Sequence, residues 1–198
     1  MAHAPVLIAA DGGANACVAA GLTPSAVIGD FDSLEASTKD RLKDTQLLHI
    51  AEQDSTDFEK SLTNIDAPFI LATGFTSARL DHTLAALSAL IQHRATPVIV
   101  LGDNDVVFAA RDHLVLDLAP GTRVSIFPMS EVTGSSTGLA WPIDDLILAP
   151  NGRIGTSNVA EGPVTLRFAQ TDCLIILPRE ALLTALHALT GSTAVPER

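Results

Sequence analysis

The alternation of strand and helix patterns over the first 103 residues is the feature that most constrains the fold of this 198-residue chain. Apolar strand patterns occur at residues 5–10, 25–28, 47–50, 68–73 and 96–103, and helical patterns at 14–21, 33–44, 55–62 and 79–94. Strands that alternate with helices form a parallel sheet with helices on its faces. The sequence therefore predicts an α/β domain over residues 1–110.

Local signals support several of these helices. Ser33 is suited to cap the helix over residues 33–44. Thr56 is followed three residues later by Glu59, which fits a capping box. The clearest helix, over 79–94, has one apolar stripe formed by Leu80, Leu84, Leu87 and Ile91.

The second half of the chain has a different pattern. From about residue 105 to 177, short apolar runs are broken by Gly, Pro, Asn and Asp, without helical periodicity. This predicts a C-terminal antiparallel β-sandwich, or a small barrel, over residues 111–198. A helical stretch at 179–189 is expected to pack on this domain or on a partner.

Charge and hydropathy exclude several function classes. The net charge is −11 and no basic cluster is present, so we expect no binding to nucleic acid or anionic lipid. We expect no signal peptide, because the first residues lack a basic region followed by a long apolar stretch, and no apolar run approaches the ~20 residues of a membrane span. Cys17 and Cys173 are expected to be two buried free thiols of a cytoplasmic protein. An acidic protein can still bind nucleotides through a metal ion, and it suits a cationic substrate.

Polar clusters follow four of the predicted strands, where ligands bind in open α/β sheets. Alone, each cluster is also explained by a turn or a helix start, because Gly, Asp and Ser are common at both. They read DGGAN (11–15), GDFDS (29–33), QDSTDFEK (53–60) and RLDH (79–82).

Together the clusters predict a cation site that handles phosphate. Mg²⁺ prefers hard oxygen ligands, and Asp30, Asp32 and Asp57 could supply them, with Asp11 nearby. Residues i and i+2 of an extended segment point to the same face, so Asp30 and Asp32 could converge on one ion. The paired glycines of DGGAN would let the backbone approach a ligand closely.

In this order, the four clusters resemble the motif series of the thiamine pyrophosphokinase family. The later segments TGLAWP (137–142) and GTSN (155–158) match that family's C-terminal β domain, so the resemblance spans residues 11 to about 177. It implies an α/β domain that binds Mg-ATP and a homodimer with thiamine at the subunit interface. The implied reaction transfers the terminal pyrophosphate of ATP to the thiamine hydroxyl, which gives thiamine diphosphate and AMP.

The resemblance also implies roles for individual residues. The metal-binding and catalytic carboxylates are Asp30, Asp32 and Asp57. From the chemistry of the cluster, and not from the resemblance, we take Asp32 as the candidate acceptor of the hydroxyl proton. The expected ATP contacts are Asp11, Gly12, Gln53, Thr56, Arg79 and Asp81. The expected thiamine contacts are Trp141, Ser157 and Asn158.

The sequence leaves two features of the proposed site open. Trp141 could stack on the thiamine cation or fill the core of the sandwich. The family typically has two glycines before RLDH, where this chain has Ser77 and Ala78, whose Cβ atoms would narrow the approach to the nucleotide.

Two other functions fit parts of the sequence. Two segments, VIGDFDS (27–33) and VIVLGDND (98–105), resemble acidic motifs of haloacid-dehalogenase-type phosphatases. The chain between these two motifs is too short for the usual core of such phosphatases, and this alternative leaves QDSTDFEK unexplained. A non-catalytic thiamine or nucleotide sensor is the second alternative. It has less need of three carboxylates.

Overall fold

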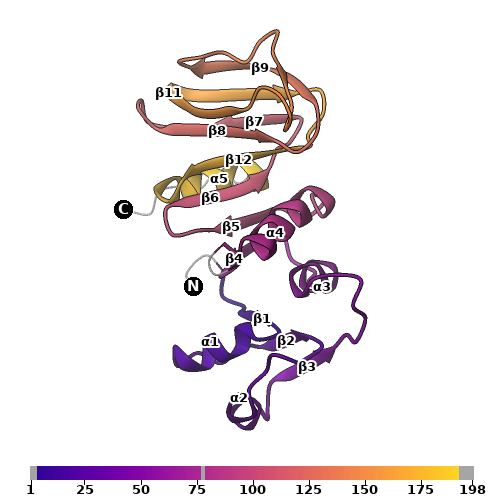
Figure 1. The fold of residues 1–198 in the computed structure, drawn as a ribbon. Coiled ribbons are helices and arrows are strands. Elements are labelled where there is room, and N and C mark those ends of the chain that lie inside the picture. Colours follow the sequence, from indigo (N-terminus) through magenta and orange to yellow (C-terminus); the bar gives the residue numbers. More distant parts are fainter. Residues whose placement is uncertain (1–3, 77–78, 192–198) are drawn as a thin grey trace, which may run out of the picture. The chain divides into compact units, whose positions relative to one another are not determined.

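The computed structural model describes residues 4–76 and 79–191 (Figure 1). Ser77 and Ala78, where the sequence departs from the family's glycines, lie outside the described residues. Contacts divide the chain into two compact units, Met1–Asp66 and Ala67–Arg198, called here the N-terminal and C-terminal units. Each unit is described by itself.

The N-terminal unit contains a parallel sheet in the order β1-β2-β3. Its strands are β1 (Ile8–Ala10), β2 (Ala26–Gly29) and β3 (Gln46–His49), and its helices are α1 (Gly13–Ala19), α2 (Ala36–Arg41) and α3 (Asp57–Asn64). Val27, at the centre of the sheet, pairs with Ala9 on one side and Leu47 on the other. Val27 and Ala9 are buried together with Ala14 of α1, and α3 contacts β2 and β1.

Helix starts in this unit match one predicted cap and correct another. The capping box of α3 is present, because Thr56 accepts a hydrogen bond from Glu59 N and Glu59 binds the Thr56 backbone N–H. Ser33 is not the N-cap of α2, which begins at Ala36 with Glu35 as its N-cap residue. Instead, the Ser33 hydroxyl donates to Asp32 in the turn after β2 and the Ser33 N–H donates to Asp11 after β1, so Ser33 is unavailable to a helix.

The C-terminal unit contains a nine-stranded sheet that joins parallel and antiparallel strands (Figure 1). The order is β10-β9-β11-β8-β12-β6-β5-β4, with β7 paired to β11. Its elements are β4 (Ile70–Thr73), α4 (Leu80–Gln92), β5 (Val98–Leu101), β6 (Asp105–Ala109), β7 (His113–Leu116), β8 (Arg123–Pro128), β9 (Val132–Leu139), β10 (Ile147–Leu148), β11 (Gly155–Phe168), β12 (Cys173–Pro178), η1 (Arg179–Ala181) and α5 (Leu182–Thr190).

This sheet changes the predicted organisation of the first half. The strands expected to form one parallel sheet lie in two sheets, because β4 and β5 pair in parallel and β5 then pairs antiparallel with β6. The tight turn between β5 and β6 is closed by Gly102 N donating to Asp105 O at 2.8 Å. Contacts therefore divide the chain after Asp66, whereas the predicted domain boundary after residue 110 and the sandwich architecture stay predictions.

The long strand β11 organises the antiparallel part. Its first residues pair with β8, and its later residues pair with both β9 and β7. Phe108, Ile126 and Leu166 are fully buried in the core that these strands enclose. Ala185 and Leu186 of α5 join this core, so the predicted C-terminal helix packs on its own unit.

The face of helix α4 that packs against the sheet is not the leucine stripe that the sequence predicted to be buried. Its buried residues are Ala86, Ala89 and Leu90, whereas Leu80 and Leu84 are 74% and 57% exposed. The helix contacts β6 and β12, and small alanine side chains allow a close approach of helix to sheet. The apolar stripe therefore correctly predicted a helix but not the side on which it packs.

Two expectations about the chain's environment can be compared with the structure. No helix in residues 4–76 or 79–191 is long and apolar enough to cross a membrane. Cys17 and Cys173 are both free thiols, as predicted, but only Cys173 is buried, whereas Cys17 is partly exposed. Burial raises the pKa of Cys173 to about 12, so this thiol stays protonated and unreactive near neutral pH.

The pairing of β9 with β11 depends on a close backbone approach at Gly134. A Cβ atom at this position would lie 2.3 Å from the Arg167 carbonyl oxygen. We expect Gly134→Ala to lower the free energy of unfolding by about 1–3 kcal/mol, because the strands must separate to admit the methyl group. Urea unfolding measures this change.

Gly152→Ala is the matched control for Gly134→Ala. A Cβ atom at Gly152 would meet its nearest atom, Ala149 Cβ, at an ordinary 3.6 Å. This variant should change stability by less than about 0.5 kcal/mol. Equal effects of the two substitutions would contradict the close approach.

Candidate functional site

Asp11 is the most buried carboxylate of the N-terminal unit and lies directly after β1. Its backbone N–H donates to Ile28 O at 2.8 Å, so the pairing of β1 with β2 extends to this residue. The residue is 2% exposed, and its Oδ2 accepts a hydrogen bond from Ser33 N at 3.3 Å. Its Oδ1 is buried without a hydrogen-bond partner. An unpaired buried carboxylate oxygen is costly, so this atom is suited to a cation.

Gly29 makes room for this carboxylate at the end of β2. A Cβ atom at Gly29 would lie only 2.7 Å from Asp11 Cβ, and the glycine has a φ of +156°. Any larger residue would collide with Asp11 and would strain the backbone. The glycine of the GDFDS cluster therefore allows the two strand ends to approach.

The turn after β2 brings Asp30 and Asp32 together by a route that the sequence did not predict. Phe31 has a φ of +67°, so the segment is a turn and not the extended strand that was expected. Asp32 N donates to Asp30 Oδ1 at 3.2 Å, and Ser33 Oγ donates to Asp32 Oδ1 at 2.8 Å. These bonds hold both aspartates in the turn that directly follows β2.

Three carboxylates converge at this point. Asp11, Asp30 and Asp32 each offer an oxygen, and these oxygens all lie within 4.8 Å of one another. Like charges at this separation repel unless a cation lies between them. Hard carboxylate oxygens and the unpaired Asp11 Oδ1 fit a divalent ion such as Mg²⁺.

Asp57 lies outside this group of three, although the sequence placed it in the metal-binding set. It is in the first turn of α3 and is half-buried, and Lys60 Nζ lies 3.4 Å from its Oδ1. Burial raises the pKa of Asp57, Lys60 opposes this effect, and the charges of Asp11 and Asp30 add to it. The structure thus brings Asp11 into the carboxylate group, and a metal-binding role for Asp57 stays a prediction.

Gln53 and Thr56, both predicted ATP contacts, already bond to protein groups in this structure. Gln53 Nε2 donates to Asp30 Oδ2 at 2.7 Å, and this bond is the main cause of the lowered pKa of Asp30. The Thr56 hydroxyl belongs to the capping box of α3. Both residues therefore orient the loop after β3, and contact with ATP stays a prediction for each.

The DGGAN cluster after β1 is bonded to the GDFDS cluster after β2. A Cβ atom at Gly12 would lie 3.0 Å from Ser33 Cβ, so this glycine also permits a close approach. Asn15 donates to Ser33 O at 2.9 Å and accepts from Glu35 N at 3.1 Å. The sequence analysis did not single out Asn15 as a residue that ties DGGAN to GDFDS.

Lys60 is the second residue that the sequence analysis missed. Its side chain is 3% exposed, and Nζ lies 3.9 Å from Asp30 Oδ2 as well as 3.4 Å from Asp57 Oδ1. Its position in the sequence is a usable signal, because a lysine near a helix start opposes the helix dipole. A buried cation in that position indicates nearby carboxylates.

Arg79 and Asp81 belong to the C-terminal unit, at the start of α4. The Arg79 guanidinium donates twice to the Asp81 carboxylate, at 3.1 and 2.6 Å, and both side chains are exposed. These bonds hold the pKa of Asp81 down at about 2 and raise the pKa of Arg79. These two of the predicted ATP contacts therefore form an ion pair with each other on the surface.

Trp141 and Asn158 form one rigid feature of the C-terminal unit. Asn158 is buried, accepts from Trp141 N at 3.2 Å and donates to Trp141 O at 2.6 Å. Trp141 is 62% exposed, so the alternative that it fills a core is wrong. Asn158 thus fixes the backbone that presents Trp141.

A pocket of about 420 Å³ lies beside this tryptophan. Both Trp141 and Asn158 line it, together with Arg153, Ile154 and Thr156. Ser157, the third predicted thiamine contact, is exposed and has a φ of +63°, and its N–H donates to Ser125 Oγ at 3.0 Å. A mostly apolar pocket with a few polar groups is suited to a small organic ligand.

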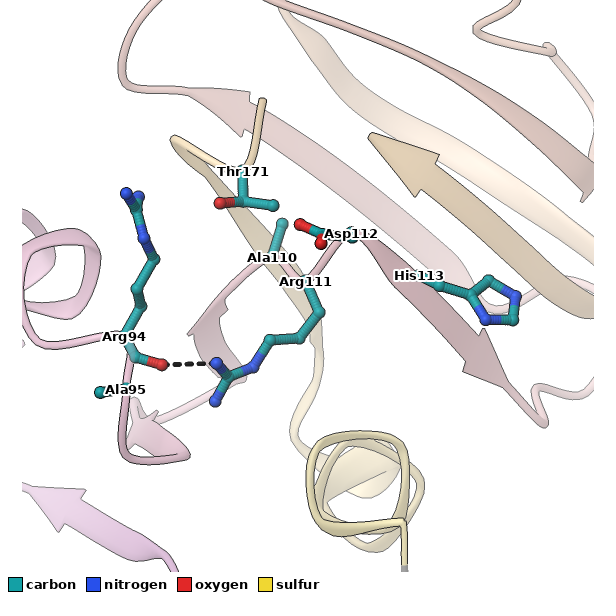
Figure 2. A pocket seen from close by; sticks show the side chains of 7 residues that line it. All are labelled: Arg94, Ala95, Ala110, Arg111, Asp112, His113 and Thr171. Atoms are coloured by element: carbon teal, nitrogen blue, oxygen red, sulfur yellow. Dashed lines mark hydrogen bonds between the residues drawn. The ribbon is translucent and has the colours of Figure 1, made fainter. Parts of the chain in front are cut away.

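A second pocket, of about 520 Å³, contains none of the predicted site residues (Figure 2). Arg94 pairs with Asp172, and Arg111 donates to the Arg94 carbonyl, as the dashed line in Figure 2 shows. Each guanidinium thus holds a neighbouring loop. We assign this pocket a structural role.

A family model matches more than half of the chain. The model for the thiamin pyrophosphokinase catalytic domain matches residues 1–106. The chain belongs to the thiamin pyrophosphokinase family. The match contains the carboxylate group, the α3 start and the Arg79–Asp81 pair, so the predicted family is confirmed.

Curated relatives agree with this assignment. Thiamin pyrophosphokinase 1 of Caenorhabditis elegans is 33% identical over 152 residues, which cover 68% of this chain and 62% of the relative. Thiamine pyrophosphokinase 1 of Oryza sativa subsp. japonica is 26% identical over 172 residues, which cover 77% of this chain and 64% of the relative. The chain therefore spans less than two thirds of the length of these two relatives.

Solved structures show the same fold. Thiamin pyrophosphokinase from Geobacillus thermodenitrificans matches with a TM-score of 0.73 at 24% identity, covering 86% of this chain and 84% of that one. The enzyme of the same name from Candida albicans matches with a TM-score of 0.75 at 15% identity, covering 89% and 82%. At these sequence identities, the structural similarity establishes a shared fold and nothing about function.

The unpaired oxygen of Asp11 leads to a test of the cation site in this family member. In Asp11→Asn, the amide oxygen can still accept from Ser33 N, and the NH₂ group can donate to a neighbouring carboxylate. We therefore expect the metal-free variant to be more stable than the parent protein by about 1 kcal/mol. Thermal unfolding in EDTA and in Mg²⁺ measures this, and Mg²⁺ should stabilise the parent protein but not Asp11→Asn.

Asp40→Asn is the control for Asp11→Asn, because Asp40 is an exposed aspartate of the same unit, 3.7 Å from Lys43. It should change stability by less than about 0.5 kcal/mol and should keep the Mg²⁺ response. Loss of stability in metal-free Asp11→Asn would contradict the cost assigned to the unpaired Asp11 Oδ1.

The Arg79–Asp81 pair gives a pH-dependent signal. The pKa of Asp81 is lowered from 3.8 to about 2, so its contribution to folding is present above about pH 4 and is lost as the pH falls through about 2. We expect an NMR titration of the Asp81 side-chain carboxyl with a midpoint near 2. Arg79→Gln should return the midpoint toward 3.8, whereas a parent midpoint already near 3.8 would show that the pair does not form.

Proposed function

We propose that this protein is an Mg²⁺-dependent thiamine pyrophosphokinase, which transfers the terminal pyrophosphate of ATP to the thiamine hydroxyl and releases AMP. One observation carries the proposal: a family member presents the buried, unpaired Asp11 oxygen beside Asp30 and Asp32 at the carboxyl ends of parallel strands. This strand edge is where α/β proteins bind ligands. The comparisons favour this reaction over a phosphatase or a sensor.

The carboxylate group supplies the metal-binding part of the proposed reaction. Asp11, Asp30 and Asp32 would hold Mg²⁺, which would offset negative charge on the transferred pyrophosphoryl group. Gln53 keeps Asp30 ionised and oriented, because its hydrogen bond lowers the pKa of that carboxyl. Buried Asp11 fixes the base of the site.

Asp32 is the proposed acceptor of the thiamine hydroxyl proton. It is exposed at the mouth of the turn, unlike Asp11, and its Oδ1 accepts a hydrogen bond only from the adjacent Ser33 hydroxyl among the described contacts. The β-phosphorus of ATP would form a bond to the thiamine oxygen while its bond to the AMP oxygen breaks. Arg79 would offset charge that develops on the phosphates.

The C-terminal unit supplies the proposed thiamine site. Trp141 presents an exposed indole ring beside the pocket, and Asn158 holds its backbone in place. The permanent positive charge of thiamine suits a cation–π contact with this ring. A homodimer with thiamine at the subunit interface is part of the proposal, and the cytoplasmic location stays a prediction.

The reaction is tested directly by incubating the protein with ATP, Mg²⁺ and thiamine. Thiamine diphosphate and AMP should form in equal amounts, which separation of the nucleotides and the thiamine esters measures. Formation of ADP in place of AMP would contradict pyrophosphoryl transfer. Binding of thiamine without either product would favour the sensor.

Asp32→Asn tests the proposed proton acceptor. We expect kcat to fall by about 10²-fold or more, because general-base assistance is lost, while the fold is kept. The asparagine oxygen can still accept from Ser33 Oγ, so the urea unfolding midpoint should barely change. Asp54→Asn, at an exposed aspartate outside the carboxylate group, is the control. A near-normal kcat in Asp32→Asn would remove Asp32 from the proton transfer.

A further inference from the structure

Lys60 is a buried cation shared between two carboxylates from different elements. The residue is only 4% exposed, and its Nζ lies 3.4 Å from Asp57 Oδ1 and 3.9 Å from Asp30 Oδ2. Asp57 is on α3, whereas Asp30 follows β2. A buried ammonium group is tolerated where carboxylates surround it, and this lysine has one on each side.

Asp30 takes part in two charge groups at once. With Asp11 and Asp32 it forms the three-carboxylate group, and with Asp57 it flanks Lys60. The space between Asp30 and Asp57 therefore has the character of a second cation position. The ammonium group of Lys60 lies in that position.

We propose that Lys60 is a built-in counter-cation that fills this second position and limits the acidic cluster to one divalent ion. The inference rests on the proposed metal-dependent function, and it adds a rule for how many ions the protein itself binds. Two of the four carboxylates, those of Asp30 and Asp57, flank the ammonium group. With the ammonium group present, Asp11, Asp30 and Asp32 attract one divalent ion while Asp57 is already neutralised.

Loss of the lysine charge should change this count. Without the ammonium group, the carboxylates of Asp30 and Asp57 would face each other without a cation between them, and like charges at short range repel. A second divalent ion would relieve that repulsion. A lysine with a merely structural role would not produce an added binding site, because its removal would only loosen the first one.

The test uses Mn²⁺ alone as the probe, without ATP or thiamine, and follows free Mn²⁺ by electron paramagnetic resonance. The parent protein should bind one Mn²⁺ per chain. Lys60→Met should bind two, with spectral broadening from two neighbouring ions. Lys60→Arg keeps the positive charge and should return to one.

Two further variants separate local charge from general effects. Lys43→Met is the matched control, because Lys43 is an exposed lysine of the same unit that pairs with Asp40 at 3.7 Å, and it should leave the count at one. Adding Asp57→Asn to Lys60→Met removes one wall of the second position and should restore a count of one. Lys60→Gln replaces Lys60→Met if the latter does not fold by circular dichroism.

One Mn²⁺ per chain in folded Lys60→Met or Lys60→Gln would overturn the inference. The result is distinguishable from failure of the proposed function, because turnover by the parent protein does not enter the count. A parent protein that binds one Mn²⁺ but forms no thiamine diphosphate would contradict the reaction and leave the role of Lys60 intact. A parent protein that binds no Mn²⁺ would overturn the inference, while the assay with ATP, Mg²⁺ and thiamine decides the reaction separately.

Discussion

The close approach of two strand ends is the constraint on which the candidate site depends. Gly29 lies against Asp11 with no room for a side chain, and the backbone bond from Asp11 N to Ile28 O fixes the distance between the strands. This contact buries the Asp11 carboxylate and leaves one of its oxygens unpaired. The turn that follows then has to carry Asp30 toward the same point, and a left-handed Phe31 does so.

The carboxylates at this site differ in the direction of their pKa shifts because their neighbours differ. A hydrogen bond from Gln53 lowers the pKa of Asp30, whereas burial raises the pKa of Asp57. Lys60 lies between these two carboxylates and attracts both. Similar side chains therefore acquire unlike properties within one small unit, which is typical of sites that handle charged substrates.

The C-terminal unit shows the same use of buried polar groups for positioning. The Asn158 side-chain amide bonds to the backbone of Trp141 and to the N–H of Val159, so Asn158 both lines the pocket and fixes the tryptophan beside it. The long strand β11 supplies that asparagine and pairs with three other strands. Fold and pocket thus depend on the same segment.

The sequence by itself determined the order of strands and helices in the first half of the chain, the capping box at Thr56 and the family motifs, because these depend on residues close together in the chain. Only the tertiary structure decided that Asp11 joins the carboxylate group while Asp57 pairs with Lys60, and that Ser33 serves the turn instead of α2. Neither outcome follows from spacing, since both depend on strand register and on the backbone turn at the end of β2. Local patterns specify which elements form, and packing specifies which of their side chains meet.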